Sequence, residues 1–229
     1  MDTSLIILGV ALIIVLYFVF YYMTMRDSLA DRLDLAQAQP PIVADKLTKP
    51  ENGKYSYELW MYVYGPKSIT ADSYIFSRDG SAGKKNIGLK LKANVPSLVL
   101  EYDNGASTAP QILITDNFPF QSWVHVLISV ENKYVDVYMN GKLVKSTKDL
   151  ALVLPPRDAP LTFGISQTYL AKFTRVAEPT DPQTAWSHYM DGNGENPIKK
   201  FTGDYKVAVS FRKGEDKSSA YNLNIIGEQ

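Results

Sequence analysis

The sequence predicts an all-β fold: an antiparallel β-sandwich or barrel with one short helix, preceded by a single transmembrane helix. Three features predict it. They are a meander of alternating residues in the middle of the chain, turn signals at regular intervals on both sides of the meander, and an unbroken apolar run close to Met1. The chain also has 15 tyrosines among 229 residues, a composition that favours strands over long helices.

The meander runs from Trp123 to Ser146 and contains three predicted strands, at 124–130, 134–140 and 142–146. In the first two, apolar residues alternate with their neighbours at a period of two, which is the pattern of half-buried strands. Asn140-Gly141 is predicted to form the turn between the second strand and the third. A type I′ hairpin turn requires positive φ at both central residues, and asparagine and glycine are the residues that favour it. The sequence therefore predicts an antiparallel meander.

Turn signals divide the rest of the central region into further short strands. We expect them at 55–64, 74–77, 87–92, 98–102, 112–114, 161–165 and 170–176. In the first of these, one face carries Tyr57, Leu59, Met61 and Val63, and the other carries Glu58, Trp60, Tyr62 and Tyr64. Short strands separated by turns about every eight to twelve residues are typical of a sandwich or barrel.

One helix and one hairpin follow the last of these strands. Thr180 is the predicted N-cap of the helix, with Pro182 in the first turn and Gln183 at the capping-box position. Gly192 is the predicted C-terminal stop. Beyond the helix, residues 205–211 and 221–225 predict a hairpin that extends the sandwich.

The apolar run at residues 5–23 predicts a membrane anchor. Its 19 residues would span about 28 Å as a helix, close to the ~30 Å hydrocarbon core of a bilayer. A secretory signal peptide needs a basic start and small residues at the cleavage site, whereas this run has an aspartate before it and tyrosines at its end. The predicted membrane-anchor residues are Leu5, Ile6, Ile7, Leu8, Val10, Leu12, Ile13, Ile14, Val15, Leu16, Tyr17, Phe18, Val19, Phe20, Tyr21, Tyr22 and Met23.

The residues that follow the anchor set its orientation and the domain boundaries. Basic residues follow the run and none precedes it, so the positive-inside rule places the rest of the chain on the cytoplasmic side. Residues 24–52 are predicted to form a juxtamembrane helix and a linker, because Leu29, Leu33 and Ala36 share one helix face and Pro40-Pro41 ends the helix. The predicted sandwich occupies 53–229, with its core at 53–194 and a C-terminal extension hairpin at 195–229.

The composition argues against several kinds of site. Lys plus Arg and Asp plus Glu both number 24, so the net charge is zero and no basic surface predicts nucleic-acid binding. Because there is no cysteine, a disulfide, a thiolate metal site and a cysteine nucleophile are all excluded. The absence of cysteine and of Asn-x-Ser/Thr acceptors also favours a domain that does not meet the secretory lumen. We expect no cofactor.

The segment 122–146, in which Trp123 opens a strand and residues 138–143 (YMNGKL) close a hairpin, resembles the laminin-G-like, concanavalin A-like jelly-roll modules. Residues 179–194 are similar to the short helix that commonly closes those modules, and the resemblance covers residues 53–194. With its N-terminal anchor and no disulfides, the chain is similar to membrane-associated structural proteins of large icosahedral DNA viruses. Members of the family often bind glycans or calcium, so the resemblance implies these as ligands to test.

For each candidate site a structural role is the expected one. Related glycosidases carry a Glu-x-Asp-x-(x)-Glu strand, but residues 101–103 (EYD) are not followed by a second glutamate, so a solvated strand end is expected. His125 is expected to pack in the meander. His188 is not expected to form a triad with Ser187, since neighbours on a helix point in different directions. Residues 191–195 lack the spacing of an EF-hand calcium loop. We therefore expect no catalytic, cofactor-binding or metal-binding residues.

Three functions are compatible with these features. The first is a non-enzymatic structural protein that anchors in a membrane and makes protein contacts, as a viral minor capsid protein does when it links the inner membrane to the capsid shell. The second is a membrane-anchored glycan-binding module in which Trp60 or Tyr62 stacks on sugars. The third, a glycosidase, is the least supported. The expected partners are the lipid membrane and other capsid proteins, with glycans as the alternative, and the expected location is a virion, between inner membrane and shell.

Overall fold

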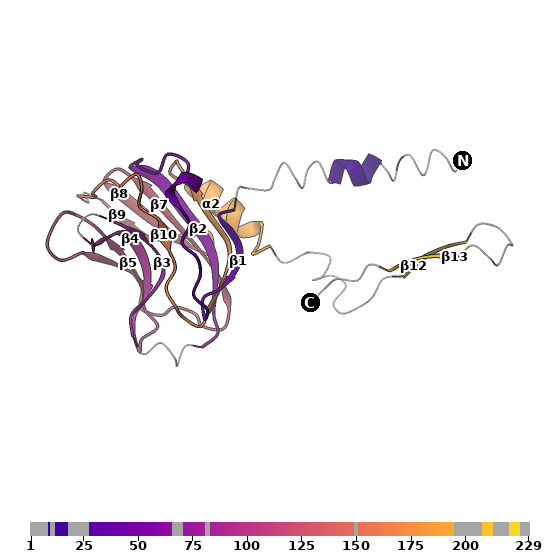
Figure 1. Ribbon diagram of the computed structural model, residues 1–229, viewed down its shortest axis with the longest axis horizontal. Helices are drawn as coiled ribbons and strands as arrows, with labels where there is room; N and C mark the ends of the chain where they lie inside the picture. Colours follow the sequence, from indigo (N-terminus) through magenta and orange to yellow (C-terminus); the bar gives the residue numbers. More distant parts are fainter. Residues whose placement is uncertain are drawn as a thin grey trace. The chain divides into compact units, whose positions relative to one another are not determined.

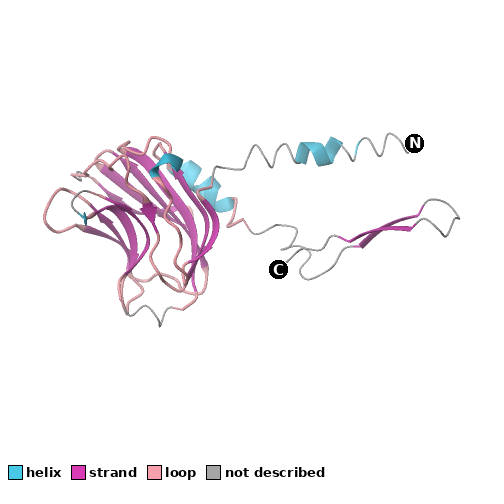
Figure 2. Ribbon diagram, in the orientation of Figure 1, coloured by secondary structure: helices cyan, strands magenta, loops and turns pink. Residues whose placement is uncertain are grey.

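The computed structural model describes residues 9, 12–17, 28–65, 71–80, 83–148, 151–194, 208–212 and 220–224. The chain divides into two compact units, Met1–Asn193 and Gly194–Gln229. The first unit contains two antiparallel sheets, and Figure 2 shows their strands in two facing layers with a helix on the outside of one layer.

The first sheet has six strands in the order β1-β11-β2-β7-β8-β9, and the second has five in the order β10-β3-β4-β5-β6. Figure 1 labels these strands except β6 and β11. Hairpins connect the neighbours in β7-β8-β9 and in β3-β4-β5-β6, whereas β11 and β2 are far apart in the sequence. The predicted antiparallel sandwich is confirmed. The strands are β1 Ala30–Asp34, β2 Lys54–Val63, β3 Ser73–Asp79, β4 Lys85–Leu91, β5 Leu98–Tyr102, β6 Gln111–Thr115, β7 Trp123–Glu131, β8 Tyr134–Met139, β9 Lys142–Thr147, β10 Leu161–Thr162 and β11 Thr168–Val176.

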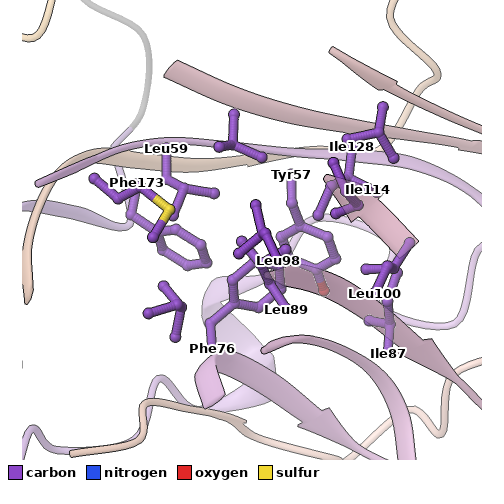
Figure 3. Packing of buried hydrophobic residues seen from close by; sticks show 14 of the residues in the cluster. Tyr57, Leu59, Phe76, Ile87, Leu89, Leu98, Leu100, Ile114, Ile128 and Phe173 are labelled. Carbon is purple, nitrogen blue, oxygen red and sulfur yellow. The ribbon is translucent and has the colours of Figure 1, made fainter. Parts of the chain in front are cut away.

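Apolar side chains from both sheets meet in one core (Figure 3). Tyr57 lies at its centre, with ring centroids 4.9 Å from Phe76 on the second sheet and 6.2 Å from Phe173 on its own sheet. Fully burying a large apolar side chain stabilises the fold by about 1.5–3 kcal/mol. The alternation of side chains along β2 therefore determines which face of this strand points into the core. The predicted inner face of β2 is fully buried and consists of Tyr57, Leu59, Met61 and Val63.

The meander predicted between Trp123 and Ser146 is confirmed as β7, β8 and β9. Val126 pairs with Met139 across the first hairpin, and β8 pairs with β9 across the second. Asn140 and Gly141 have φ values of 49° and 74°, which are the positive values that a type I′ turn requires.

Helix α2 (Pro182–Met190) begins one residue later than predicted. Its N-cap is Asp181, whose carboxylate accepts hydrogen bonds from the backbone N–H groups of Gln183 and Thr184. The predicted cap, Thr180, instead donates its hydroxyl to Ser56 on β2. An ionised cap is favoured at the positive end of the helix dipole, which explains why the aspartate takes this position.

The predicted helix in the 24–52 segment is wrong for its described part. Residues Ala30–Asp34 form strand β1, which pairs antiparallel with β11 at the edge of the first sheet. Leu33 lies opposite Leu170 and packs against the core, and Leu35 is fully buried. The spacing of Leu29 and Leu33 suits a helix in isolation, but hydrogen bonds to β11 and burial of Leu33 and Leu35 against the core override that local preference.

The sandwich therefore begins before residue 53, and the predicted boundary there is wrong. Ile42 pairs with Leu161 and belongs to the core. Of the predicted anchor, only residues 9 and 12–17 are described, and they are helical and exposed; the remainder of 5–23 and residues 24–27 lie outside the described residues. Within the part of the chain that the structure describes, no helix is both long enough and apolar enough to cross a bilayer.

The second unit contains an antiparallel pair of strands, β12 (Ala208–Arg212) and β13 (Ala220–Asn224). Phe211 lies opposite Tyr221 in this pair. The predicted C-terminal hairpin is confirmed over these residues. The rest of the predicted strands lies outside the described residues.

Candidate functional site

A row of aromatic side chains crosses the outer face of the six-stranded sheet. The strand register places Tyr169 opposite Tyr62, and Tyr62 opposite Trp123, on the adjacent strands β11, β2 and β7. Asp34 on β1 lies opposite Tyr169 and extends the row to a fourth strand. Their chain neighbours point into the core, so these side chains point away from it. We call Tyr62, Tyr64, Trp123 and Tyr169 the aromatic row.

The four rings contact one another in sequence. The ring centroids lie 5.6 Å apart for Tyr62 and Trp123, 6.4 Å apart for Tyr62 and Tyr169, and 4.6 Å apart for Tyr64 and Tyr169. The Tyr64 hydroxyl donates to the Asp34 carboxylate at 3.1 Å. Tyr169 is exposed and the other three are half-buried. The row therefore presents ring surface to solvent, with a carboxylate at one end.

Such a surface suits a ligand with a flat apolar face and polar groups at its edge. Tyrosine and tryptophan offer a large rigid area together with a polar group at the tip. A sugar ring has axial C–H groups that stack on aromatic faces and hydroxyls that accept from or donate to neighbouring polar groups. The Asp34 carboxylate and the tyrosine hydroxyls are the polar groups available here. Ligand sites commonly combine aromatic lining with a few such polar groups.

Beside the row, helix α2 is fixed to the same face of the sheet by a buried ionisable cluster. The Glu58 carboxylate on β2 lies between two imidazoles: Oε1 is 3.0 Å from His125 Nε2, and Oε2 is 2.7 Å from His188 Nδ1. Glu58 and His125 are buried, and His188 comes from α2. We call these three residues the histidine–glutamate lock.

The lock determines the charge state of its carboxylate. Burial on its own raises the pKa of Glu58, but hydrogen bonds from His125 and His188 more than offset it and lower that pKa to about 2. A carboxylate with this pKa is ionised across the physiological range. Both of its oxygens are occupied by imidazole nitrogens, so its geometry is that of a structural link between β2 and α2.

Aromatic packing supports the same docking of α2. Trp60 stacks on Tyr189 with centroids 5.6 Å apart and contacts His125 at 5.1 Å. Position 141, in the β8–β9 turn, has no room for a larger residue than glycine, because Trp186 lies above it. A Cβ there would be 2.9 Å from the indole ring. Of the two residues proposed to stack on sugars, Trp60 is therefore covered by the helix and only Tyr62 is accessible.

The carboxylate proposed from the glycosidase pattern lies on the second sheet. Glu101 accepts from Lys90 at 2.6 Å, from Gln111 at 3.0 Å and from the Tyr74 hydroxyl. Burial opposes its ionisation, but these hydrogen bonds leave the pKa of Glu101 below its ordinary value. The prediction of a solvated strand end is wrong, because Glu101 is buried in this polar cluster.

The other acidic residue of that pattern does not complete a pair with Glu101. Asp103 is buried and its carboxylate accepts from the backbone N–H of Gly105 at 2.8 Å, which stabilises its own turn. His125 packs in the meander as predicted, but its bond to Glu58 was not predicted.

Residues 191–194 close helix α2, and Gly192 has a positive φ of 70° as a C-terminal stop requires. Glu195 lies outside the described residues. Among the described side chains, no group of three His, Cys, Asp or Glu residues is placed to hold a metal ion.

Sequence reasoning missed the aromatic row and the lock. It placed Glu58, Trp60, Tyr62 and Tyr64 on one face of β2, which is correct. Their partners on β7, β11 and α2 depend on strand register and on helix docking, which local patterns do not specify. A useful signal was present, since one strand rarely carries three aromatics and a glutamate on a face that is simply solvated.

Comparisons with known proteins agree with this fold. A family profile described as "Concanavalin A-like lectin/glucanases superfamily" matches residues 38–178. No curated protein matches the sequence. The structure is similar to the ligand-binding domain of botulinum neurotoxin serotype D in complex with N-acetylneuraminic acid, with a TM-score of 0.57, 12% identity, and coverage of 74% of this chain and 44% of that one.

Two further botulinum neurotoxin structures are also similar. One is the binding domain of neurotoxin DC in complex with rat synaptotagmin II, with a TM-score of 0.51, 15% identity, and coverage of 62% of this chain and 37% of that one. The other is the receptor-binding domain of mosaic serotype C/D, with a TM-score of 0.51, 13% identity and the same coverage. The chain spans less than half the length of each of these domains, and at such identities the likeness shows the fold alone.

Proposed function

Because the chain belongs to the concanavalin A-like lectin/glucanase superfamily, we propose that it is a non-enzymatic carbohydrate-binding protein that residues 5–23 anchor in a membrane. The observation that carries the proposal is the aromatic row, which aligns Tyr169, Tyr62 and Trp123 across three adjacent strands. A row of this kind offers consecutive stacking positions to consecutive sugar rings of an oligosaccharide.

The row also predicts modest affinity. Aromatic contacts contribute about 0.5–1.5 kcal/mol each beyond the area they bury, so three stacked rings give a weak single-site interaction. Anchoring in a membrane compensates for this, because many copies on one surface act together and raise the overall avidity. A neighbour with the same fold is described as binding N-acetylneuraminic acid, which supports the sandwich as a scaffold for sugar recognition.

The absence of catalysis is part of the proposal. A retaining glycosidase needs two carboxyl groups about 5–5.5 Å apart, one of them a general acid with a raised pKa. Glu101 is ion-paired with Lys90 and its pKa is lowered, which is the opposite of what a general acid requires. Asp103 is committed to its own turn. These features support binding without hydrolysis.

The test uses the full chain in nanodiscs on an immobilised glycan array. We expect saturable binding that soluble sugar competes away, and we expect Tyr62→Ala and Trp123→Ala each to weaken it at least several-fold. Tyr134→Ala is the matched control, because this tyrosine is exposed at the β7–β8 turn, away from the row. Binding that both row variants retain in full would refute a sugar site at the row.

A second candidate is a structural protein that links a membrane to a protein shell, as a minor capsid protein of a large icosahedral DNA virus does. Strand β9 favours it, since β9 ends the order of the first sheet and Leu143 and Val144 on it are 50% and 43% exposed. An exposed sheet edge can accept a strand from a partner. In this case the sandwich faces the cytoplasm during assembly and lies under the shell in the virion.

Protease protection separates the two candidates. In the structural case, the sandwich in intact particles resists protease until the outer shell is removed and then remains with the lipid fraction. Digestion from the outside of intact particles would contradict the structural role and the cytoplasmic orientation, and would leave carbohydrate recognition at an exposed surface.

A further inference from the structure

The distance between the proposed anchor and the sandwich is short. The apolar run ends at Met23, and among the described residues the first hydrogen bonds to the sandwich are made by Ser28 and Leu29. Residues 24–27 lie between them, so five Cα–Cα steps separate Met23 from Ser28. A fully extended chain covers at most about 3.3–3.6 Å per residue, so this connection reaches no more than roughly 18 Å. An anchored sandwich is therefore held close to the bilayer surface.

The point where the chain enters the sandwich is well defined. The backbone N–H of Leu29 donates to the carbonyl of Phe173 at 2.8 Å. The preceding residue of β11, Lys172, donates its ammonium to the carbonyl of Gly192 at 2.8 Å and to that of Asp191 at 3.4 Å. The entry point thus lies beside the C-terminal turn of α2 and the second half of β11.

Two exposed apolar side chains flank this entry point. Met190, in the last turn of α2, is 64% exposed, and Val176, at the end of β11, is 43% exposed. Along the chain, Met190 is two residues from Gly192, and Val176 is three residues from Phe173, a separation of about 10 Å in an extended strand. We call Ser28, Val176 and Met190 the entry corner.

From the length of the connection and the place where it ends, we propose that the entry corner rests on the lipid headgroup region, with Met190 and Val176 in contact with lipid. The proposal depends on the membrane anchoring proposed above and adds which part of the sandwich faces the bilayer. Apolar side chains at the headgroup boundary bury part of their surface in the acyl region, which favours this orientation over one in which they face water.

The proposal also assigns the opposite side of the sandwich. The first sheet runs from β1 at the entry corner to β9, with five strand spacings between them. At about 4.8 Å per spacing, β9 lies roughly 24 Å from β1. The β9 edge then points away from the membrane, and the aromatic row lies along the flank, open to a ligand from the side.

The absence of cysteine makes the test direct, because single cysteines can be introduced into the otherwise unchanged full chain. Val15→Cys, Met190→Cys and Leu113→Cys are each labelled with an environment-sensitive fluorophore in nanodiscs that contain brominated lipids. Leu113 is the matched control, an apolar residue 50% exposed on β6, the edge strand at the other end of the second sheet from β10.

We expect bromolipid quenching of the labels at Val15 and Met190, and none at Leu113. If the label at Val15 is quenched but the label at Met190 is no more quenched than that at Leu113, the orientation is refuted and the anchor stands. If the label at Val15 is itself unquenched, the membrane anchoring fails and the orientation fails with it. Val176→Cys is a second probe of the same corner and must behave as Met190→Cys does.

Discussion

Replacing Glu58 with glutamine tests whether the histidine–glutamate lock holds α2 on the sheet. Glutamine keeps the size of the side chain and removes its charge. One imidazole nitrogen then loses a carboxylate acceptor in a buried position, where His125 has no exposure. We expect the variant to fold, with α2 held less firmly over Trp60.

The magnitude follows from the pKa of Glu58. Its decrease from 4.5 to about 2 is worth roughly 3 kcal/mol of folding free energy at 1.36 kcal/mol per pH unit. Because the folded-state pKa is lower than the unfolded one, this contribution is fully present above about pH 4.5 and is lost as the pH falls towards 2. The glutamine variant lacks it at every pH. The stability difference between wild type and variant is therefore largest at neutral pH and narrows towards pH 2.

The assay is urea unfolding of the full chain in mild detergent, followed by tryptophan fluorescence at several pH values. Glu131→Gln is the control, because Glu131 forms an exposed ion pair with Lys54 and its loss should produce no measurable change. A stability loss of the same size at neutral and acidic pH would mean that the substitution acts through packing and that the charge is irrelevant. No loss at neutral pH would refute the lock.

Three further tests use substitutions in other parts of the sandwich. Asp181→Ala removes the N-cap of α2 and should lower the thermal midpoint by about 2–4 °C, measured by circular dichroism. Gly141→Ala should destabilise more than Gly105→Ala in urea unfolding, since both have positive φ but only Gly141 has an indole ring 2.9 Å from the new Cβ. Lys90→Met should cost up to about 3 kcal/mol in urea unfolding, because the buried Glu101 carboxylate loses its ammonium partner and keeps only Gln111 and Tyr74, and adding Glu101→Leu should recover part of that loss.

Local patterns in the sequence predict most of the strands. The strands β2 and β7 and the turn at Asn140-Gly141 are confirmed, but both faces of β7 are buried from Val124 to Val130, where the alternation predicts only one buried face. These features depend on neighbours within a few positions, and the buried face of a strand is legible from a period of two. The helix that begins at Pro182 was likewise predicted from its capping residues, with an error of one position.

The features that escaped prediction depend on partners far away in the chain. β1 is a strand because β11 supplies its hydrogen bonds. The two strands are about 140 residues apart in the sequence, since Ala30 pairs with Phe173. His188 reaches Glu58 only because α2 folds back over β2. The aromatic row likewise exists only once the register of three strands is set. In each case the sequence supplied the residue types, and the tertiary structure supplied their proximity.

The β1 strand limits how far the sandwich can lie from the membrane if the proposed anchor holds it there. If residues 24–52 were a helix and linker, the sandwich would be free to sample a wide zone above the membrane. With β1 at Ala30–Asp34 and Ser28 already hydrogen-bonded to β11, the connection shrinks to residues 24–27 and about 18 Å. Together with the ~24 Å width of the first sheet, this places the β9 edge within roughly 40 Å of the bilayer. A sugar ligand must then be displayed close to the membrane that holds the protein. In the structural case, the shell must approach the membrane to within that distance wherever this protein links the two.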